Sequence, residues 1–232
     1  MILMENIMYK LDNNDAYLWL KTIENESIDL VISDPPYESL EKHRAIGTTT
    51  RLKNSNSSSN EWFPVIKNKQ LAMVIKEIYR ILRPNSHFYL FCDNETMFYI
   101  KPIAEKVGFK FWKPIIWDKV NIGMGYHYRS KYENILFFEK GKRKLNNLSI
   151  PDILTCKRII NGYPTEKPVA LNEILIHQSS SIGDIVADPF MGSGSVAEAA
   201  LINGRKFIGT DIKSNAVYIT EQRLKKATAA YG

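Results

Sequence analysis

Apolar residues along the chain follow two different spacings, and segments with the two spacings alternate. Short runs rich in β-branched and aromatic residues predict strands over 29–33, 86–92, 109–117, 132–139, 184–187 and 206–210. Apolar residues at helical spacing predict helices over 71–82, 95–107, 168–177, 195–203 and 214–227. Because strands that alternate with helices of this length form parallel sheets, we expect an α/β fold with a doubly wound, mostly parallel sheet.

Proline, glycine and small polar residues mark the ends of these elements. Pro84 follows the helix predicted over 71–82, and Gly108 is placed to end the helix predicted over 95–107. The segment 47–60, GTTTRLKNSNSSSN, has almost no large apolar residues. We therefore predict a mobile loop over 38–60, because loops of this length are usually functional or disordered. No internal repeat occurs, so we expect residues 1–232 to form a single domain.

Composition narrows the class of protein. Of the 232 residues, 44% are hydrophobic and 24% are charged, a globular balance that excludes a disordered or collagen-like chain. No apolar run reaches the ~18 residues of a membrane helix, and the start, MILMENIMYK, does not resemble a signal peptide. Cys92 and Cys156 are too few for a disulfide framework or a zinc site, so we expect two reduced thiols in a cytoplasmic protein.

Positive charge is concentrated in one part of the chain. The whole sequence has a net charge of +6, whereas residues 101–145 hold eleven basic and four acidic side chains, so the remainder sums to −1. Nine aromatic residues are interleaved with these charges. A local basic patch is typical of a polyanion site, because each neutralised phosphate releases a counterion. The alternative, a solvated lysine face over the aromatic core of a strand, stays open.

The first candidate site directly follows the strand predicted over 29–33 and consists of Asp34, Pro35, Pro36 and Tyr37. Two prolines fix φ and remove two backbone donors, so the strand ends and the following turn is stiff. The turn then presents one carboxylate, carbonyl oxygens and one aromatic ring. This combination suits a flat substrate with an amino group, since Asp34 and the Pro35 carbonyl can each accept one amino hydrogen while Tyr37 stacks on the ring.

The second candidate site is DPFMGSGS at 188–195, between a predicted strand and a predicted helix. Its glycines permit a tight turn and a close ligand, and the helix N-terminus offers free N–H groups. Asp211 lies 17 residues after Gly194 and ends the next strand, near the ~20-residue spacing of an acid that binds ribose hydroxyls. The pair implies a nucleoside-bearing cofactor. The spacing alone does not choose between NAD and S-adenosylmethionine, but a nicotinamide oxidoreductase leaves residues 34–37 unexplained.

DPPY at 34–37 and DPFMGSGS at 188–195 together resemble the amino-group DNA methyltransferases, which methylate adenine N6 or cytosine N4 with S-adenosylmethionine. Their order resembles the permuted β subclass, which implies a Rossmann-like methyltransferase fold with permuted motif order. Shorter segments at 14–16 (NDA), 78–85 (IYRILRPN), 128–138 (YRSKYENILFF) and 163–171 (YPTEKPVAL) are similar to further family elements. The chain departs from the family pattern at Asn14 for Gly, Tyr132 for His, Glu166 for Gln and Asp211 for Glu.

The resemblance implies a role for each matched residue. The catalytic corner comprises Asp34, Pro35, Pro36 and Tyr37. Residues implied in binding S-adenosylmethionine are Asp15, Ala16, Asp34, Lys167, Asp188, Phe190, Gly192, Ser193, Gly194, Ser195 and Asp211. Within this set, the acid of the 14–16 element contacts the cofactor adenine and Lys167 meets the cofactor carboxylate.

The implied partner is double-stranded DNA, whose target base must be flipped out to reach such a pocket, with stacking on Tyr37. The basic residues expected at the phosphates are Arg51, Lys53, Lys113, Lys119, Arg129, Lys131, Lys142, Arg143 and Lys144. We expect loop 38–60 to become ordered only with DNA bound, and segment 140–162 to form a small target-recognition insert. Because that insert is short, a short target, use of loop 38–60, a homodimer and a second specificity or restriction subunit all stay open.

We therefore predict a site-specific DNA adenine-N6 methyltransferase of a bacterium or phage, either solitary or in a restriction-modification system. Asp as the first residue of the corner favours adenine over the alternative target, cytosine N4. Methylation of RNA bases or of a protein glutamine is disfavoured, because those enzymes usually place the glycine motif first. From a different class, a non-catalytic DNA-binding partner subunit is disfavoured by the intact Asp34, Tyr37 and Asp211.

Overall fold

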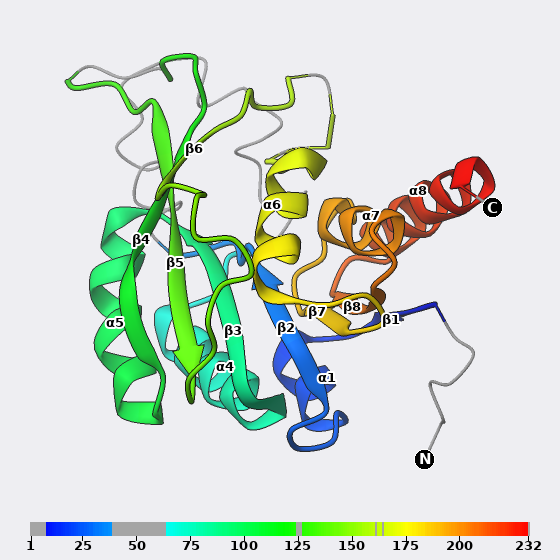
Figure 1. The fold of residues 1–232 in the computed structure, drawn as a ribbon, viewed down its shortest axis with the longest axis horizontal. Helices are drawn as coiled ribbons and strands as arrows, with labels where there is room; N and C mark the ends of the chain where they lie inside the picture. The colour runs from blue at the N-terminus through cyan, green and yellow to red at the C-terminus, as the bar shows by residue number, and fades with distance from the viewer. Residues whose placement is uncertain (1–7, 39–63, 124–126, 161, 164, 232) are drawn as a thin grey trace.

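The computed structural model describes residues 8–38, 64–123, 127–160, 162–163 and 165–231. These residues form one sheet with the strand order β1-β8-β7-β2-β3-β5-β4-β6 (Figure 1). The strands are β1 Tyr9–Asn13, β2 Ile28–Ser33, β3 Leu82–Cys92, β4 Lys110–Asp118, β5 Tyr132–Lys140, β6 Ile153–Thr155, β7 Ile185–Asp188 and β8 Lys206–Asp211. The helices are α1 Ala16–Lys21, α4 Asn68–Ile81, α5 Asn94–Val107, α6 Val169–Ser179, α7 Ser195–Ile202 and α8 Ser214–Tyr231.

The sheet is mostly parallel, as the alternation of strands and helices predicts. Neighbouring strands from β1 to β3 are parallel, β5 is antiparallel to both β3 and β4, and β6 is parallel to β4. The eleven elements predicted from the sequence are all present, with bounds that move by at most four residues. Three elements were not predicted from the sequence, because β1 is a half-buried edge strand, α1 has six residues and β6 has three.

Helices cover both faces of the sheet and create two hydrophobic layers (Figure 1). Helices α1, α4 and α5 pack on one face, and α6, α7 and α8 pack on the other. Every residue of β2 is buried, with Val31 facing the first layer and Leu30 and Ile32 facing the second. A strand buried on both faces is typical of the centre of a parallel sheet. None of the helices among the described residues is long and apolar enough to cross a membrane.

The strand order reverses between β7 and β2, and this reversal creates the crevice in which the motifs meet. From β2 the chain passes through α4 to β3 on one side, whereas from β7 it passes through α7 to β8 on the other side. The turns that follow β2 and β7 therefore diverge over opposite faces of the sheet. Ligands of doubly wound folds bind outside the carboxyl ends of the strands at such a point.

Candidate active site

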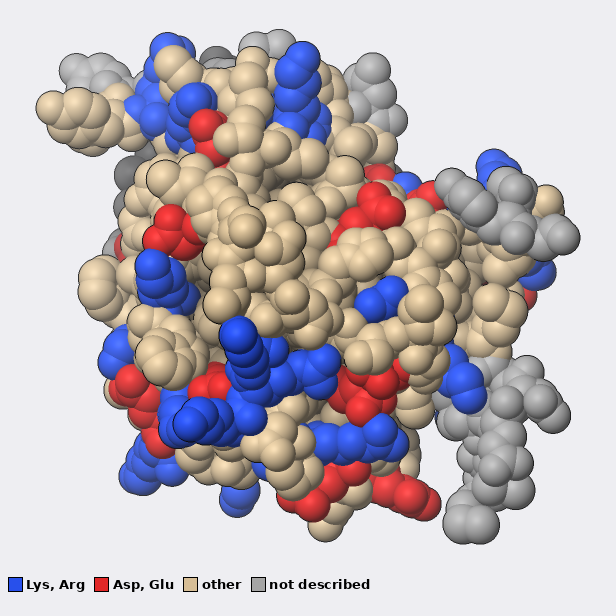
Figure 2. All heavy atoms as spheres, viewed as in Figure 1, with Lys and Arg blue, Asp and Glu red and all other residues tan. Residues whose placement is uncertain are grey.

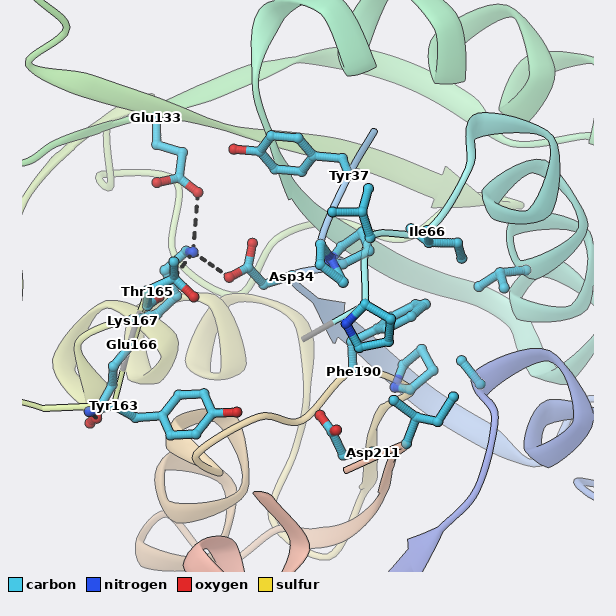
Figure 3. Close-up of a pocket in the computed structure, with 18 of the residues that line it drawn as sticks. Asp34, Tyr37, Ile66, Glu133, Tyr163, Thr165, Glu166, Lys167, Phe190 and Asp211 are labelled. Carbon is cyan, nitrogen blue, oxygen red and sulfur yellow. Dashed lines mark hydrogen bonds and ion pairs between the residues drawn. The ribbon is translucent and has the colours of Figure 1, made fainter. Parts of the chain in front are cut away.

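A cleft of about 810 Å³ opens at the carboxyl edge of the sheet (Figure 3). Its walls come from several separate parts of the chain: the β1–α1 turn, residues 34–37, residues 64–66 with the first half of α4, the end of β4 with the start of β5, residues 158–167, and the turns after β7 and after β8. A second, smaller cavity of about 40 Å³ lies beside the turn over residues 188–195, which we call the glycine loop. Asp34 and Lys167 line both cavities. The two sequence motifs therefore meet at one place, although about 150 residues separate them.

The turn after β2 is held in place by the chain that precedes α4. Ile66 N–H donates to the Pro36 carbonyl at 2.7 Å, and Tyr37 pairs with Ile66 as an isolated β-bridge. The described residues supply no hydrogen bond to the Pro35 carbonyl, and Pro35 lines the cleft. The corner thus keeps one carbonyl oxygen available for a ligand. The Tyr37 ring lies above Asp34 on the same side of the cleft.

Asp34 belongs to a buried cluster of alternating charges (Figure 3). Lys167 Nζ donates to Asp34 Oδ2 and lies 3.2 Å from Glu133 Oε1. Lys119 Nζ lies 2.7 Å from the other carboxylate oxygen of Glu133. The side chain of Lys167 is 7% exposed and that of Glu133 is 12% exposed. We call these four residues the Asp34 cluster.

Burial and neighbouring charges move the pKa values of the Asp34 cluster in different directions. Burial raises the pKa of Asp34 to about 6, with a further rise from the Glu133 charge and an opposing effect of Lys167. Burial also favours the neutral form of Glu133, but the ammonium groups of Lys167 and Lys119 together outweigh it and lower the pKa of Glu133. The two carboxylates likewise outweigh burial at Lys167 and raise its pKa, so this lysine stays charged.

The glycine loop is shaped by two residues with positive φ. Gly192 has φ +52° and Gly194 has φ +78°. A Cβ at Gly194 would lie 2.5–3.0 Å from the side chain of Thr220, whereas a Cβ at Gly192 would meet only the Tyr163 ring, at 3.6 Å. Thr220 also donates to the Gly192 carbonyl at 3.0 Å. Close packing against α8 therefore requires glycine at 194.

Two further carboxylates flank the glycine loop. Asp188 is buried and accepts from Ser33 Oγ at 3.0 Å and from Phe190 N–H at 2.9 Å, while burial raises its pKa to about 7. Asp211 accepts from the N–H groups of Gly192 at 3.1 Å and Lys213 at 2.8 Å, and burial raises its pKa. Both carboxylates thus fix the loop that they border.

Most residues proposed from the sequence for the cofactor lie together. The larger cleft is lined by Asp15, Ala16, Asp34, Lys167, Phe190 and Asp211. The smaller cavity is lined by Asp188, Ser193 and Ser195 in addition to Asp34 and Lys167. Asp15 has a structural use as well, because its Oδ1 caps α1 by accepting from the N–H groups of Tyr17 and Leu18. The predicted contact of Lys167 with a cofactor carboxylate stays a prediction, since in this structure Nζ binds Asp34 and Glu133.

The basic residues proposed for DNA do not lie together. Strand β5 runs antiparallel to β3, with Asn134 beside Cys92 and Lys140 beside Ser86, so it carries the chain away from the cleft. Lys142, Arg143 and Lys144 consequently lie at the opposite edge of the sheet, roughly 20 Å along β3 at ~3.3 Å per residue. This geometry gives no support to the prediction that these three residues contact DNA at the cleft.

The remaining basic residues have varied surroundings. Lys119 lines the cleft within the Asp34 cluster, Lys131 pairs with Asp118 at 3.1 Å, and Arg129 is exposed in the β4–β5 connection. Lys113 pairs with Asp152 at 2.6 Å. Lys and Arg side chains accordingly gather in separate upper and lower groups on one face (Figure 2). Arg51, Lys53 and most of loop 38–60 lie outside the described residues.

Segment 140–162 is divided between the two edges of the sheet. Its first residues lie at the far edge, β6 pairs with β4, and Trp117 Nε1 donates to the Cys156 carbonyl at 2.8 Å. Only its last part, including Arg158, Ile159 and Ile160, lines the cleft. The prediction that segment 140–162 forms a small target-recognition insert stays a prediction, and its last residues are the part placed to serve it.

Two residues at the site were not assigned a role from the sequence. Glu133 lies in the 128–138 segment that resembles a family element, but that likeness indicated no partner for it. Tyr163 lies across the cleft from Asp34 and beside Asp211, and burial together with the Asp211 charge raises its pKa to about 12. Neither contact follows from spacing in the sequence, because each joins elements that are distant along the chain.

Comparison with known proteins gives a consistent result. The N6/N4 family model described as DNA methylase matches residues 28–161 and 146–222. The type II methyltransferase M.HpaI of Haemophilus parainfluenzae is 31% identical over 242 residues, covering 91% of this chain and 72% of that protein. The DNA adenine methyltransferase YhdJ of Escherichia coli K12 is 29% identical over 255 residues, covering 93% and 82%. The crystal structure of M1.HpyAVI superposes with a TM-score of 0.69 at 25% identity, covering 94% of this chain and 98% of that one.

Proposed function

The chain belongs to the N6/N4 DNA methylase family, and from this premise we propose that it transfers the methyl group of S-adenosylmethionine to the N6 amino group of adenine in double-stranded DNA. One observation carries the proposal. Asp34 lines both the open cleft and the small cavity beside the glycine loop. Its carboxylate can therefore reach an amino group in the first cavity while a cofactor occupies the space next to the second.

The chemistry of the donor set fits S-adenosylmethionine. The glycine-loop side carries the carboxylates of Asp188 and Asp211, and a cavity lined by acidic groups favours a cationic ligand. Asp188, Ser193 and Ser195 would hold the ligand at the smaller cavity, and Asp15, Phe190 and Asp211 would hold it in the larger one. When bound, S-adenosylmethionine supplies a methyl carbon attached to a positively charged sulfur, which makes that carbon electrophilic.

The corner after β2 prepares the amino group. An exocyclic amino nitrogen is a weak nucleophile because its lone pair is delocalised into the ring. Asp34 and the Pro35 carbonyl each accept one amino hydrogen, which draws the nitrogen toward tetrahedral geometry and localises the lone pair. With S-adenosylmethionine bound, that lone pair would take up its methyl carbon, the former C–S electron pair would stay on sulfur, and the amino nitrogen would release one proton. Proton release follows transfer, because a methylated ammonium on such a ring is strongly acidic, so Asp34 serves mainly as acceptor and orienting group.

A base in a duplex cannot reach Asp34, so the base must be extruded into the cleft. Tyr37 lies on the wall beside Asp34, and its ring offers a stacking surface for a flat base. Arg129, Lys131 and Arg158 are exposed near the carboxyl edge and are our candidates for phosphate contacts. Both curated relatives are bacterial, and we place the activity with the bacterial DNA in the cytoplasm.

Adenine is favoured over cytosine by two observations. The corner begins with Asp34, and the relative YhdJ, which aligns with 93% of this chain, is named a DNA adenine methyltransferase. The family model covers both N6 and N4 amino targets, so the base must be identified directly. M.HpaI is named a type II methyltransferase, and this likeness supports a role in restriction-modification for this chain.

The test is to incubate the purified protein with unmethylated double-stranded DNA and methyl-labelled S-adenosylmethionine, followed by nucleoside analysis. We expect label in N6-methyladenine. Label in N4-methylcytosine would correct the base, and DNA without label would contradict the proposal. Asp34→Ala should lose transfer by at least ~10²–10³-fold, the effect of removing one oriented polar group. Glu221→Gln, at an exposed position on α8, is the matched control and should keep full activity.

A further inference from the structure

The acceptor Asp34 shares its lysine with a second carboxylate. Lys167 Nζ lies between Asp34 and Glu133, over the Phe91 ring at 5.2 Å from its centroid, and donates to the Thr165 carbonyl at 3.3 Å (Figure 3). With these contacts the ammonium group is surrounded on several sides and has little freedom to move. A buried lysine in such a position determines where its two carboxylate partners lie.

Glu133 is itself fixed from the side away from Asp34. One of its oxygens faces Lys167 and the other faces Lys119, whose Nζ lies 5.0 Å from the Trp117 ring centroid. Two carboxylates and two ammonium groups thus alternate through the Asp34 cluster, and their formal charges cancel. Removal of any one charged member leaves the cluster with an uncompensated net charge, which changes the field at the other three.

The ion pair with Lys167 occupies only one oxygen of Asp34. Lys167 binds Oδ2, and the described residues supply no hydrogen bond to Oδ1. The amino group to be methylated needs one acceptor on the carboxylate, so an occupied Oδ2 directs that group to Oδ1.

We propose that Glu133 and Lys119 are positioning residues for methyl transfer: acting through Lys167, they hold Asp34 with Oδ2 occupied and Oδ1 open to the amino group of the target base. The inference rests on the proposed function and deepens it by assigning roles to residues outside both sequence motifs. Lys167, which touches Asp34 directly, transmits the effect of the other two. Asp34 then enters the reaction already oriented and ionised.

Removal of a negative charge near Asp34 and removal of a positive charge near Asp34 should move its pKa in opposite directions. The groups that face it are Lys167, Glu133 and Lys119 of the cluster, with Asp188, Tyr37 and Cys92 around them. Burial raises the pKa values of Tyr37 and Cys92, so both are neutral at neutral pH. When the Glu133 charge is removed, Lys167 pairs with Asp34 alone, and this favours the ionised form of Asp34. Loss of the Lys119 charge removes a positive group and favours the protonated form.

The experiment is a carboxyl ¹³C NMR titration of the ligand-free protein with labelled aspartate, in which Asp34→Asn identifies the Asp34 resonance. We expect the Asp34 midpoint to move to lower pH in Glu133→Gln and to higher pH in Lys119→Met, each by about one unit. The acid limb of the methyl-transfer pH profile should move in the same directions. Glu221→Gln and Lys225→Met, which break an exposed 2.9 Å pair on α8, are the matched controls and should leave the midpoint unchanged.

A purely structural role predicts a different result, namely equal loss of stability in Glu133→Gln and Lys119→Met with no opposed movement of the midpoint. That result, or shifts in the same direction, would overturn the inference. Movement of the midpoint without movement of the pH profile would also overturn it. If a single variant does not fold, the other one still gives a signed shift against wild type. Because the titration uses no substrate, a wild-type protein that fails to methylate DNA would contradict the proposed function without altering the titration.

Discussion

Asn13 and Asp211 lie opposite each other as the last residues of two neighbouring parallel strands, although 198 positions separate them in the sequence. Asn13 Nδ2 donates to the Asp211 carbonyl at 2.8 Å. Strand β1 thereby places the turn that carries Asp15 beside the turn that carries Asp211. The side of the cleft that we propose for the cofactor is therefore assembled from the beginning and the end of the described chain, as the permuted motif order requires.

Thr210 joins these two strand ends, and its hydroxyl should matter for both stability and cofactor binding. Its side chain is fully buried, and Oγ1 accepts from Asn14 N–H at 3.1 Å. In Thr210→Val this buried contact is lost, so we expect the free energy of unfolding to fall by about 1 kcal/mol. Affinity for S-adenosylmethionine should fall as well, because Asp15 follows Asn14 directly. Denaturant unfolding and calorimetry measure the two effects.

Thr228→Val supplies the control for that comparison. Thr228 Oγ1 donates to the Leu224 carbonyl within α8, far from the cleft. This variant removes the same hydroxyl but should leave cofactor affinity at the wild-type value. Equal loss of affinity in both variants would show that Thr210 has no particular role at the strand ends.

The two glycines of the loop should respond differently to alanine. In Gly194→Ala the new Cβ meets Thr220 at 2.5 Å and the residue keeps a positive φ, so we expect strong loss of cofactor binding and of stability. In Gly192→Ala the Cβ has space, and only the left-handed backbone is penalised, by about 1–2 kcal/mol. Thermal unfolding and cofactor titration should rank the variants in this order. Thr220→Ala should restore part of the loss in Gly194→Ala, and equal effects of the two glycine variants would disprove the packing argument.

Asp188 should make stability depend on pH. Burial raises its pKa from 3.8 to about 7 in the folded state, so folding favours the protonated form. Its contribution is complete below pH 3.8 and is lost as the pH rises toward 7. Asp188→Asn does not titrate, so its free energy of unfolding should rise relative to wild type across this range, by a few kcal/mol at about 1.4 kcal/mol per pKa unit. Denaturant unfolding at intervals between pH 4 and 8 measures the difference, and a constant difference across that range would contradict the prediction.

Charge removal at the two edges of the sheet should affect DNA binding unequally. Arg129 and Lys131 lie at the carboxyl edge, whereas Lys142 and Lys144 lie at the far edge. We expect Arg129→Ala with Lys131→Ala to weaken DNA binding and to reduce the slope of log affinity against log salt by about one for each lost phosphate contact. The pair Lys142→Ala with Lys144→Ala removes the same charge and should leave the slope unchanged. A reduced slope in the second pair alone would place the DNA on the far edge.

The helices, the strands and the two chemical motifs could be identified from local patterns of residues alone. Apolar spacing is a local property, so it identifies β2, β3 and α4 without knowledge of their neighbours, as it does for the other long elements. Pro35 and Pro36 end β2 at Ser33 for a reason that is also local, since they fix φ and lack N–H groups. Strand β6 was not predicted, because three residues are too few to show an alternation of apolar and polar positions.

Contacts between distant groups became visible only in the folded chain. The sequence contained Lys167 and Glu133 but gave no reason to pair them with Asp34, because those contacts depend on the order of strands in the sheet. The basic window 101–145 is continuous in sequence, yet the antiparallel course of β5 distributes it over opposite edges of the sheet. The spacing of apolar residues indicates whether one segment forms a helix or a strand. The order and direction of the strands are set by packing among all of the elements.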